Sequence, residues 1–349
     1  MPLLPSYCAD FRAASCLLGL ALLTAMSALA QPGKAQTDFF APAAKPVAVF
    51  TGGLGEACEG PAMSPEGLLY FTDTPSATSA GIVWVYNPQS QKTTVARSPS
   101  SNASGLLSDA AGDLITVEGA NGGGRQLTKT NHQTGISTTL VSTFAGKPFN
   151  APNDATLDVQ GNLYFTDARY AGPEPLELPF MGVYRLAPGG PAQLLAANAA
   201  KPNGIAISPD QKTLYVASYE YPQAGVYGTL PSGFTGPVAG SRGDLLAYDL
   251  LPNGQMKLRQ TLQHYEGQGP DGIKVDVEGN LYAIVANCVV VYSPLGIKLA
   301  EQPVPVREGY ATNLCFGRGK YSKTLFITAT KTLYLLETKK EGWQIPAGR

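Results

Sequence analysis

Cysteine and histidine are scarce in this chain of 349 residues. It has five cysteines, of which only Cys58, Cys288 and Cys315 follow the first thirty residues. Three cysteines form at most one disulfide and are otherwise buried free thiols, so disulfides do not hold this fold together. The two histidines, His132 and His264, are too few for a zinc site of the usual histidine-rich kind.

An excess of charge of either sign is also missing. The chain has 25 Lys and Arg residues against 26 Asp and Glu residues, a formal net charge of −1, and no run of basic residues. This balance argues against nucleic acid or an anionic membrane surface as a partner. Nothing in the sequence indicates an oligomeric state.

A marked apolar run occurs near the N-terminus, at Leu17–Met26. It follows Arg12 and precedes the small residues of Ala28-Leu29-Ala30, which is typical of a secretory signal peptide cleaved before Gln31. A membrane anchor is the alternative, but this run is too short to span a bilayer and no later run is long enough.

We therefore expect an exported protein, periplasmic or secreted, that carries no membrane span. Residues 1–30 are its signal peptide, residues 31–45 a linker, and residues 46–349 a single domain.

One sequence unit recurs six times in the mature chain. The copies begin at intervals of 45, 49, 50, 68 and 42 residues, a period typical of repeat architectures. They read EGPAMSPEGLLYFTD from Glu59, SGLLSDAAGDLITVE from Ser104, NDATLDVQGNLYFTD from Asn153, NGIAISPDQKTLYVAS from Asn203, DGIKVDVEGNLYAIV from Asp271 and NLCFGRGKYSKTLFIT from Asn313.

Each unit has the chemistry of β-hairpins. Short apolar runs alternate with turn signals such as SPEG, DVQGN and DVEGN, and two further strand patterns follow each hairpin. Six units of four antiparallel strands predict an all-β fold, a six-bladed β-propeller. The last unit lacks a fourth strand, and we expect VAVFT at 47–51 to close the ring as the outer strand of the sixth blade.

The first residue of every unit is polar. If each unit begins with the innermost strand of its blade, these six side chains converge on the mouth of the central channel. For any one unit a turn-forming role explains Asn or Asp beside Gly, but Glu59 has no such role. Two carboxylates, Glu59 and Asp271, together with amide oxygens suit a hard divalent cation, and calcium tolerates such an irregular oxygen cage better than magnesium does.

The chain resembles the superfamily of senescence marker protein, gluconolactonase and luciferin-regenerating enzyme, and is most like its bacterial gluconolactonases. The motifs that carry this resemblance are EGP at 59–61, APND with GNLYFTDARY between 151 and 170, GVYRLAPGG at 182–190, KPNGIAISPD with LYVAS between 201 and 218, and GPDGIKVDVEGNLY at 269–282. The resemblance implies a six-bladed propeller with one divalent metal, commonly calcium, at the channel mouth. It further implies Glu59, Asn153, Asn203 and Asp271 as the metal ligands.

The activity that the resemblance implies is hydrolysis of a sugar lactone or related ester, a carboxylic ester hydrolase reaction (EC 3.1.1). Ser104-Gly105 stands where many relatives have Asn-Gly, which leaves any substrate contact there in doubt. We expect Asp271 to act as the base or nucleophile, or else as a ligand only. The alternatives are a non-catalytic propeller that keeps calcium for structure and binds a ligand or protein, and an esterase or phosphotriesterase with the same metal.

Other residues near the expected mouth have two interpretations each. Asp154 points away from the ligand side and orients the ligands, or stabilises a turn. Glu118, Arg169, Tyr170 and Asn313 contact the substrate or support the site, whereas the structural alternative is a hydrogen-bond acceptor within the blade for Glu118 and a solvated loop for Arg169 and Tyr170.

Two further expectations concern loops. The segment 219–244 is long enough to be a lid on the mouth face. We place His264 in a connection between blades on that face, and His132 in a turn on the opposite face.

Overall fold

The computed structural model describes residues 38–76, 79–219, 229–238 and 243–346. The chain divides into two units, 1–31 and 32–349, and the account below concerns the second. The expected signal peptide lies outside the described residues. Within the described part, no helix has the length and apolarity needed to cross a membrane.

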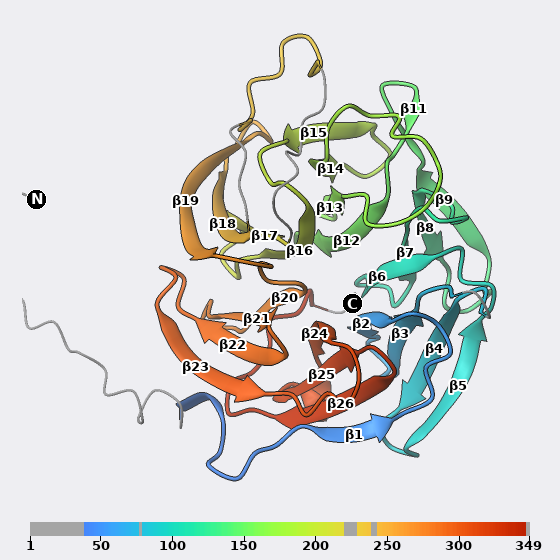
Figure 1. The fold of residues 1–349 in the computed structure, drawn as a ribbon, viewed down its shortest axis with the longest axis vertical. Helices are drawn as coiled ribbons and strands as arrows, with labels where there is room; N and C mark the ends of the chain where they lie inside the picture. The colour runs from blue at the N-terminus through green and yellow to red at the C-terminus, as the bar shows by residue number, and fades with distance from the viewer. Residues whose placement is uncertain (1–37, 77–78, 220–228, 239–242, 347–349) are drawn as a thin grey trace, which may run out of the picture. The chain divides into compact units, whose positions relative to one another are not determined.

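Six four-stranded antiparallel sheets surround a central channel, each with its first strand innermost (Figure 1). Blade 1 consists of β2 (Cys58–Met63), β3 (Leu69–Asp73), β4 (Ile82–Asn87) and β5 (Lys92–Arg97). Blade 2 consists of β6 (Ala103–Ser108), β7 (Leu114–Glu118), β8 (Gln126–Thr130) and β9 (Ser137–Val141). Blade 3 consists of β12 (Pro152–Leu157), β13 (Leu163–Asp167), β14 (Gly182–Leu186) and β15 (Ala192–Ala196).

The other three blades repeat this plan. Blade 4 consists of β16 (Pro202–Ile207), β17 (Thr213–Ser218), β18 (Gly243–Leu250) and β19 (Met256–Tyr265). Blade 5 consists of β20 (Ile273–Val275), β21 (Leu281–Val285), β22 (Cys288–Tyr292) and β23 (Lys298–Pro303). Blade 6 consists of β24 (Ala311–Phe316), β25 (Thr324–Ala329), β26 (Thr332–Glu337) and β1 (Val47–Phe50), with a 3₁₀ turn at Gly319–Tyr321. The predicted six-bladed, all-β architecture is confirmed.

The predicted closure of the ring is also confirmed. Strand β1 pairs antiparallel with β26 in the order β1-β26-β25-β24, so the start and the end of the domain share one blade. A second link lies at the channel, where the Thr312 hydroxyl donates to the Cys58 carbonyl at 2.7 Å. The strand pairing thus ties the N-terminal segment into blade 6 at the outer edge, and a hydrogen bond joins blade 6 to blade 1 at the inner edge.

The core lies between the blades. Inner and middle strands are covered on both faces by neighbouring sheets, so β13 and β17 are buried along their whole length. The outer strands β5 and β9 are mostly exposed and polar. Aromatic rings fill the gap between sheets, as where Phe165 stacks on Tyr184 with ring centroids 5.1 Å apart. This packing makes the inner strands a rigid frame for the side chains at the channel.

The sequence pattern did not predict three features. A two-stranded hairpin of β10 (Thr143–Phe144) and β11 (Lys147–Pro148) lies between blades 2 and 3. Phe39 and Phe40, in the segment expected to be a linker, are 5% and 1% exposed and pack against blades 5 and 6. The tail at 343–345 lines the end of the channel opposite the mouth.

The three cysteines of this unit are free thiols. Cys58 and Cys315 are buried, as expected if the cysteines are buried free thiols, whereas Cys288 is partly exposed. No disulfide joins them in the described structure.

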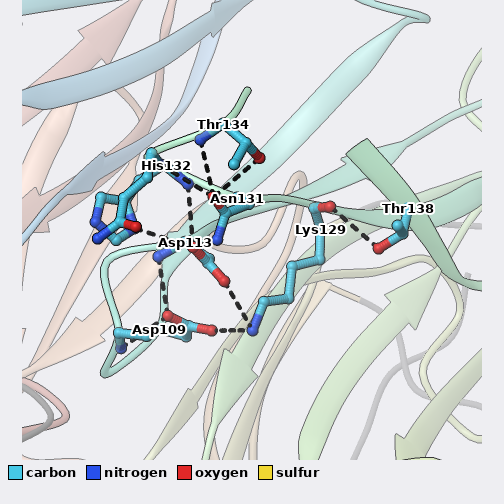
Figure 2. A network of polar contacts seen from close by, with 9 residues as sticks. Asp109, Asp113, Lys129, Asn131, His132, Thr134 and Thr138 are labelled. Atoms are coloured by element: carbon cyan, nitrogen blue, oxygen red, sulfur yellow. Dashed lines mark hydrogen bonds and ion pairs between the residues drawn. The ribbon is translucent and has the colours of Figure 1, made fainter. Parts of the chain in front are cut away.

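The turns of blade 2 on the face opposite the mouth form a charged network (Figure 2). The Lys129 ammonium lies 2.6 Å from Asp109 Oδ2 and 3.1 Å from Asp113 Oδ2, and the His132 backbone N–H donates to Asp113 Oδ1 at 3.0 Å. Burial alone would raise the pKa of Asp113, but hydrogen bonds from His132 and Lys129 outweigh it and hold that pKa below its usual range. His132 therefore belongs to a structural turn on this face, as predicted.

His264 is placed differently from the expectation. It lies within β19 rather than in the connection that follows, and its Nδ1 is 2.7 Å from Asp244 Oδ1. The strand is longer than its apolar pattern suggested because β18 and β19 remain paired as far as Gly243 and Tyr265.

Candidate metal and substrate site

A pocket of about 200 Å³ opens at the mouth of the channel. Its walls come from the starts of the inner strands and from loops on the same face of several blades. The lining includes Glu59, Ser104, Asn153, Tyr170, Asn203 and Asp271 from the sequence-derived set. The structure therefore brings together, in one pocket, the four residues expected to be metal ligands.

A bulge in the inner strand of five blades aims these side chains. The pairing with the second strand shifts register at or next to the polar residue in five blades, for example between Glu59 and Ala62 and between Pro202 and Ile205. In blade 5, Asp271 lies two residues before β20, yet its N–H still donates to the Ile284 carbonyl at 2.9 Å. Such bulges re-aim a side chain at the end of a strand, and here they direct it into the channel.

Glycine follows the polar residue in four of the six blades, and it allows neighbouring inner strands to approach closely. A Cβ added to Gly204 would lie 2.3 Å from the Asp271 carbonyl oxygen, and one added to Gly272 would lie 2.0 Å from Asn313 Oδ1. A larger residue at either position would push the inner strands apart. Asp154 occupies the equivalent position in blade 3.

Glu59 is fixed by two hydrogen bonds to one oxygen. Its Oε2 accepts from the Gly60 N–H at 2.6 Å and from Asn313 Nδ2 at 3.1 Å. Burial, with a smaller contribution from the negative charge of Asp154, raises the pKa of Glu59 to about 7, although these two hydrogen bonds lower it. Asn313 therefore supports a carboxylate of the pocket, which is one of the roles expected for it.

Asp271 has an oxygen with no protein partner. The side chain is 6% exposed, and its Oδ1 is buried without a hydrogen bond. Burial raises the pKa of Asp271 well above its usual range, the charges of Glu59 and Asp154 add to this, and a hydrogen bond from Asn203 opposes it. A buried carboxylate oxygen of this kind needs a positive partner.

The donor set fits a hard cation. Two carboxylates and two amides from four blades offer oxygen ligands, and the unpartnered oxygen of Asp271 marks where a positive charge is missing. In the described part of the chain, no three His, Cys, Asp or Glu side chains are grouped so that they could hold one ion. A metal site here would therefore combine the carboxylates Glu59 and Asp271 with the amide oxygens of Asn153 and Asn203.

Asp154 does not line the mouth pocket, which agrees with the expectation that it points away from the ligand side. It is 1% exposed, its Oδ1 accepts from the Ala155 N–H at 2.8 Å, and its Oδ2 lies 3.6 Å from the Lys274 ammonium. Its charge nevertheless acts on both Glu59 and Asp271.

Two of the expected site residues lie outside the pocket lining. Glu118 is 3% exposed and accepts hydrogen bonds from Gln126 and Thr128 within its own blade. The Arg169 guanidinium donates to the Asn150 carbonyl and to carbonyls of the loop that follows β13. Glu118 thus binds side chains of its blade, Arg169 holds the backbone of a loop, and neither lines the mouth pocket.

The rim of the pocket carries aromatic residues that the repeat pattern did not single out. Tyr219 and Tyr310 line the pocket together with Tyr170, whose ring meets that of Tyr219 edge to face with centroids 5.9 Å apart. The Lys201 ammonium lies 4.9 Å from the centre of the Tyr170 ring. Tyr219 begins the long segment that suggested a lid, but residues 220–228 and 239–242 of that segment lie outside the described residues.

Fold and site together define a six-bladed propeller with a carboxylate and amide cluster at the channel mouth. The model of the SMP-30/Gluconolactonase/LRE-like region matches residues 57–227 and 238–331, which is more than half of the chain. The chain belongs to this family.

Individual relatives agree with this assignment. A gluconolactonase of Zymomonas mobilis is 31% identical over 238 residues, which are 64% of this chain and 60% of that protein, so the match spans less than two thirds of the relative. The solved structure of a gluconolactonase from Xanthomonas campestris shares 27% identity with a TM-score of 0.70, covering 86% of this chain and 92% of that one. Regucalcin from Agrobacterium tumefaciens, described as a calcium-binding protein, shares the fold at 19% identity with a TM-score of 0.63, covering 86% of this chain and 96% of that one.

Proposed function

We propose that this protein is a calcium-dependent hydrolase of sugar lactones, with its active site in the mouth pocket. The observation that carries the proposal is the buried, unpartnered Oδ1 of Asp271 beside a second carboxylate. The family of the chain and its gluconolactonase relatives support the substrate class.

The residues that would hold the cation are Glu59, Asn153, Asn203 and Asp271. A divalent cation bound there supplies polarisation of the lactone carbonyl and stabilisation of the developing oxyanion. Calcium suits the set because these oxygens come from four different blades and form an irregular cage.

Asp271 also has the means to take part in the reaction. As a base, its carboxylate takes a proton from a water molecule, whose oxygen then adds to the lactone carbonyl carbon. The ring C–O bond breaks, the ring oxygen gains a proton, and the product is the open hydroxy acid. Tyr170, Tyr219 and Tyr310 at the rim provide flat apolar surfaces against which a sugar ring packs.

The test is a panel of neutral sugar lactones and simple esters, assayed with calcium and with a chelator. We expect chelation to abolish lactone hydrolysis and Asp271→Asn to lower it at least about 100-fold, since a positioned base contributes that much or more. Asp249→Asn, at an exposed surface pair with Arg259, is the matched control and leaves activity unchanged.

Three results would contradict the proposal. Activity on the panel that resists chelation removes the metal from the mechanism. A calcium-binding chain that turns over no lactone or ester is a non-catalytic propeller instead, and one that prefers simple esters is an esterase with the same metal.

We also propose that the protein is exported to the periplasm or secreted. The apolar run at Leu17–Met26 and the small residues before Gln31 support this. Amino-terminal sequencing of protein from the cell envelope or medium is expected to begin at Gln31, and a chain that retains residues 1–30 in the cytoplasm would contradict export.

A further inference from the structure

An ion pair lies inside the channel beneath the mouth pocket. The Lys274 ammonium, on the inner strand β20, is 3.6 Å from Oδ2 of Asp154 on the inner strand β12. Oδ2 is buried and has no hydrogen-bond partner, so this ammonium is its nearest compensation. Lys274 itself is 25% exposed and lines the cavity of about 90 Å³ at the opposite end of the channel.

The position of Asp154 is unusual among the blades. It follows the polar first residue of its unit, where four other blades have glycine, and it therefore brings a third carboxylate into the ring of inner strands. Gly105 of the neighbouring blade leaves room for it, since a Cβ there would lie 2.7 Å from Asp154 Oδ1. A buried carboxylate next to two others is costly unless a positive group accompanies it.

We propose that Lys274 is a built-in cation that sets the charge of the metal site. When ionised to bind a metal, Glu59, Asp154 and Asp271 carry three negative charges, Lys274 carries one positive charge, and the net charge of −2 matches one divalent ion. Lys274 thereby acts through Asp154, without touching substrate, disfavours a second cation and lowers the preference for trivalent ions. The inference rests on the metal site proposed above.

The electrostatic interactions of the site support this role. The charge of Asp154 raises the pKa of Glu59, and the charge of Lys274 lowers it. Lys274 therefore acts on the carboxylate of Glu59 as well as on its direct partner, Asp154. The field of a fixed ammonium in a partly buried channel is screened less than that of a surface lysine.

A four-member charge series tests the proposal by metal binding alone. The full mature chain, Lys274→Met, Asp154→Asn and the double variant have net site charges of −2, −3, −1 and −2. For each, the dissociation constants of Ca²⁺ and Tb³⁺ are measured at pH 8 by calorimetry and by sensitised terbium luminescence. We expect the preference for Tb³⁺ over Ca²⁺ to rise about tenfold in Lys274→Met and to fall about tenfold in Asp154→Asn. The double variant returns to within about threefold of the wild-type preference, because the charge is restored.

A matched control and three outcomes complete the design. Lys340→Met removes a lysine that is 22% exposed and pairs with Glu278 away from the channel, and it leaves both constants unchanged. The role of Lys274 is only structural, and the inference fails, in either of two cases. In the first, the preference for Tb³⁺ over Ca²⁺ does not follow the net site charge across the four proteins. In the second, the dissociation constants of both ions rise by the same factor in each variant. If the wild-type chain binds neither ion, the metal site fails and the inference fails with it. If wild type binds calcium and the double variant fails to restore the preference, the inference alone is overturned.

Discussion

At the scale of single residues, the pocket depends on side chains that do not face the substrate. Glu59 and Asp271 supply charge, but Asn313 holds Glu59 through a 3.1 Å hydrogen bond from a neighbouring blade. Asn313 is 1% exposed, and its own Oδ1 accepts from the Leu314 N–H at 2.8 Å, so its amide group has a fixed orientation. A carboxylate positioned in this way binds a cation without first having to be ordered.

Replacement of Asn313 by alanine tests this support. The variant leaves Glu59 Oε2 with the Gly60 N–H alone, and we expect the calcium dissociation constant to rise about tenfold, the low end of the range for such supporting residues. Calorimetric titration of the chelator-treated protein measures the change. Asn253→Ala, in an exposed turn, is the control and leaves calcium binding unchanged. Equal calcium affinities for Asn313→Ala and wild type would show that Gly60 alone fixes Glu59.

At the scale of strands, the sequence was informative wherever the repeat was regular. The alternation and turn chemistry of each unit predicted four strands, and the shared register of Glu59, Asn153, Asn203 and Asp271 predicted that these residues meet. The bulge at the first residue, present in five blades, was not predictable, because one inserted residue changes the pairing without changing the apolar pattern.

Features outside the repeat could not be predicted from it. Tyr219 and Tyr310 reach the rim from connections that differ between blades, so no periodicity marks them. Arg169 follows a repeated strand, but the carbonyls that it contacts belong to an irregular loop. The pairing of Asp154 with Lys274 joins blades 3 and 5, and contacts between distant segments do not appear in a local pattern.

At the scale of the whole molecule, the propeller is a ring that its two ends must close. Phe39 and Phe40 add to this closure, because Phe39 packs edge to face with Tyr282 at 6.2 Å and its carbonyl accepts from the Lys339 N–H at 2.8 Å. The segment before β1 therefore binds blades 5 and 6 and is more than a spacer. The strand β1 then covers the edge of β26, which would otherwise present unpaired backbone groups.

Two N-terminal truncations, each compared with a reference chain that begins at Gln31, separate the contribution of the two phenylalanines from that of β1. A chain beginning at Pro46 loses the burial of Phe39 and Phe40, and we expect its free energy of unfolding to fall by several kcal/mol, given about 3–5 kcal/mol for removal of one buried phenylalanine side chain. A chain beginning at Gly52 also loses β1. Its ring is open at blade 6, and the free edge of β26 pairs between molecules, so we expect aggregation as well as a lower melting temperature. Thermal unfolding and gel filtration distinguish the two steps. If the chains beginning at Pro46 and Gly52 melt and elute alike, β1 adds nothing beyond the phenylalanines and hydrogen bonding at the inner edge, from Thr312 to Cys58, is sufficient to close the ring.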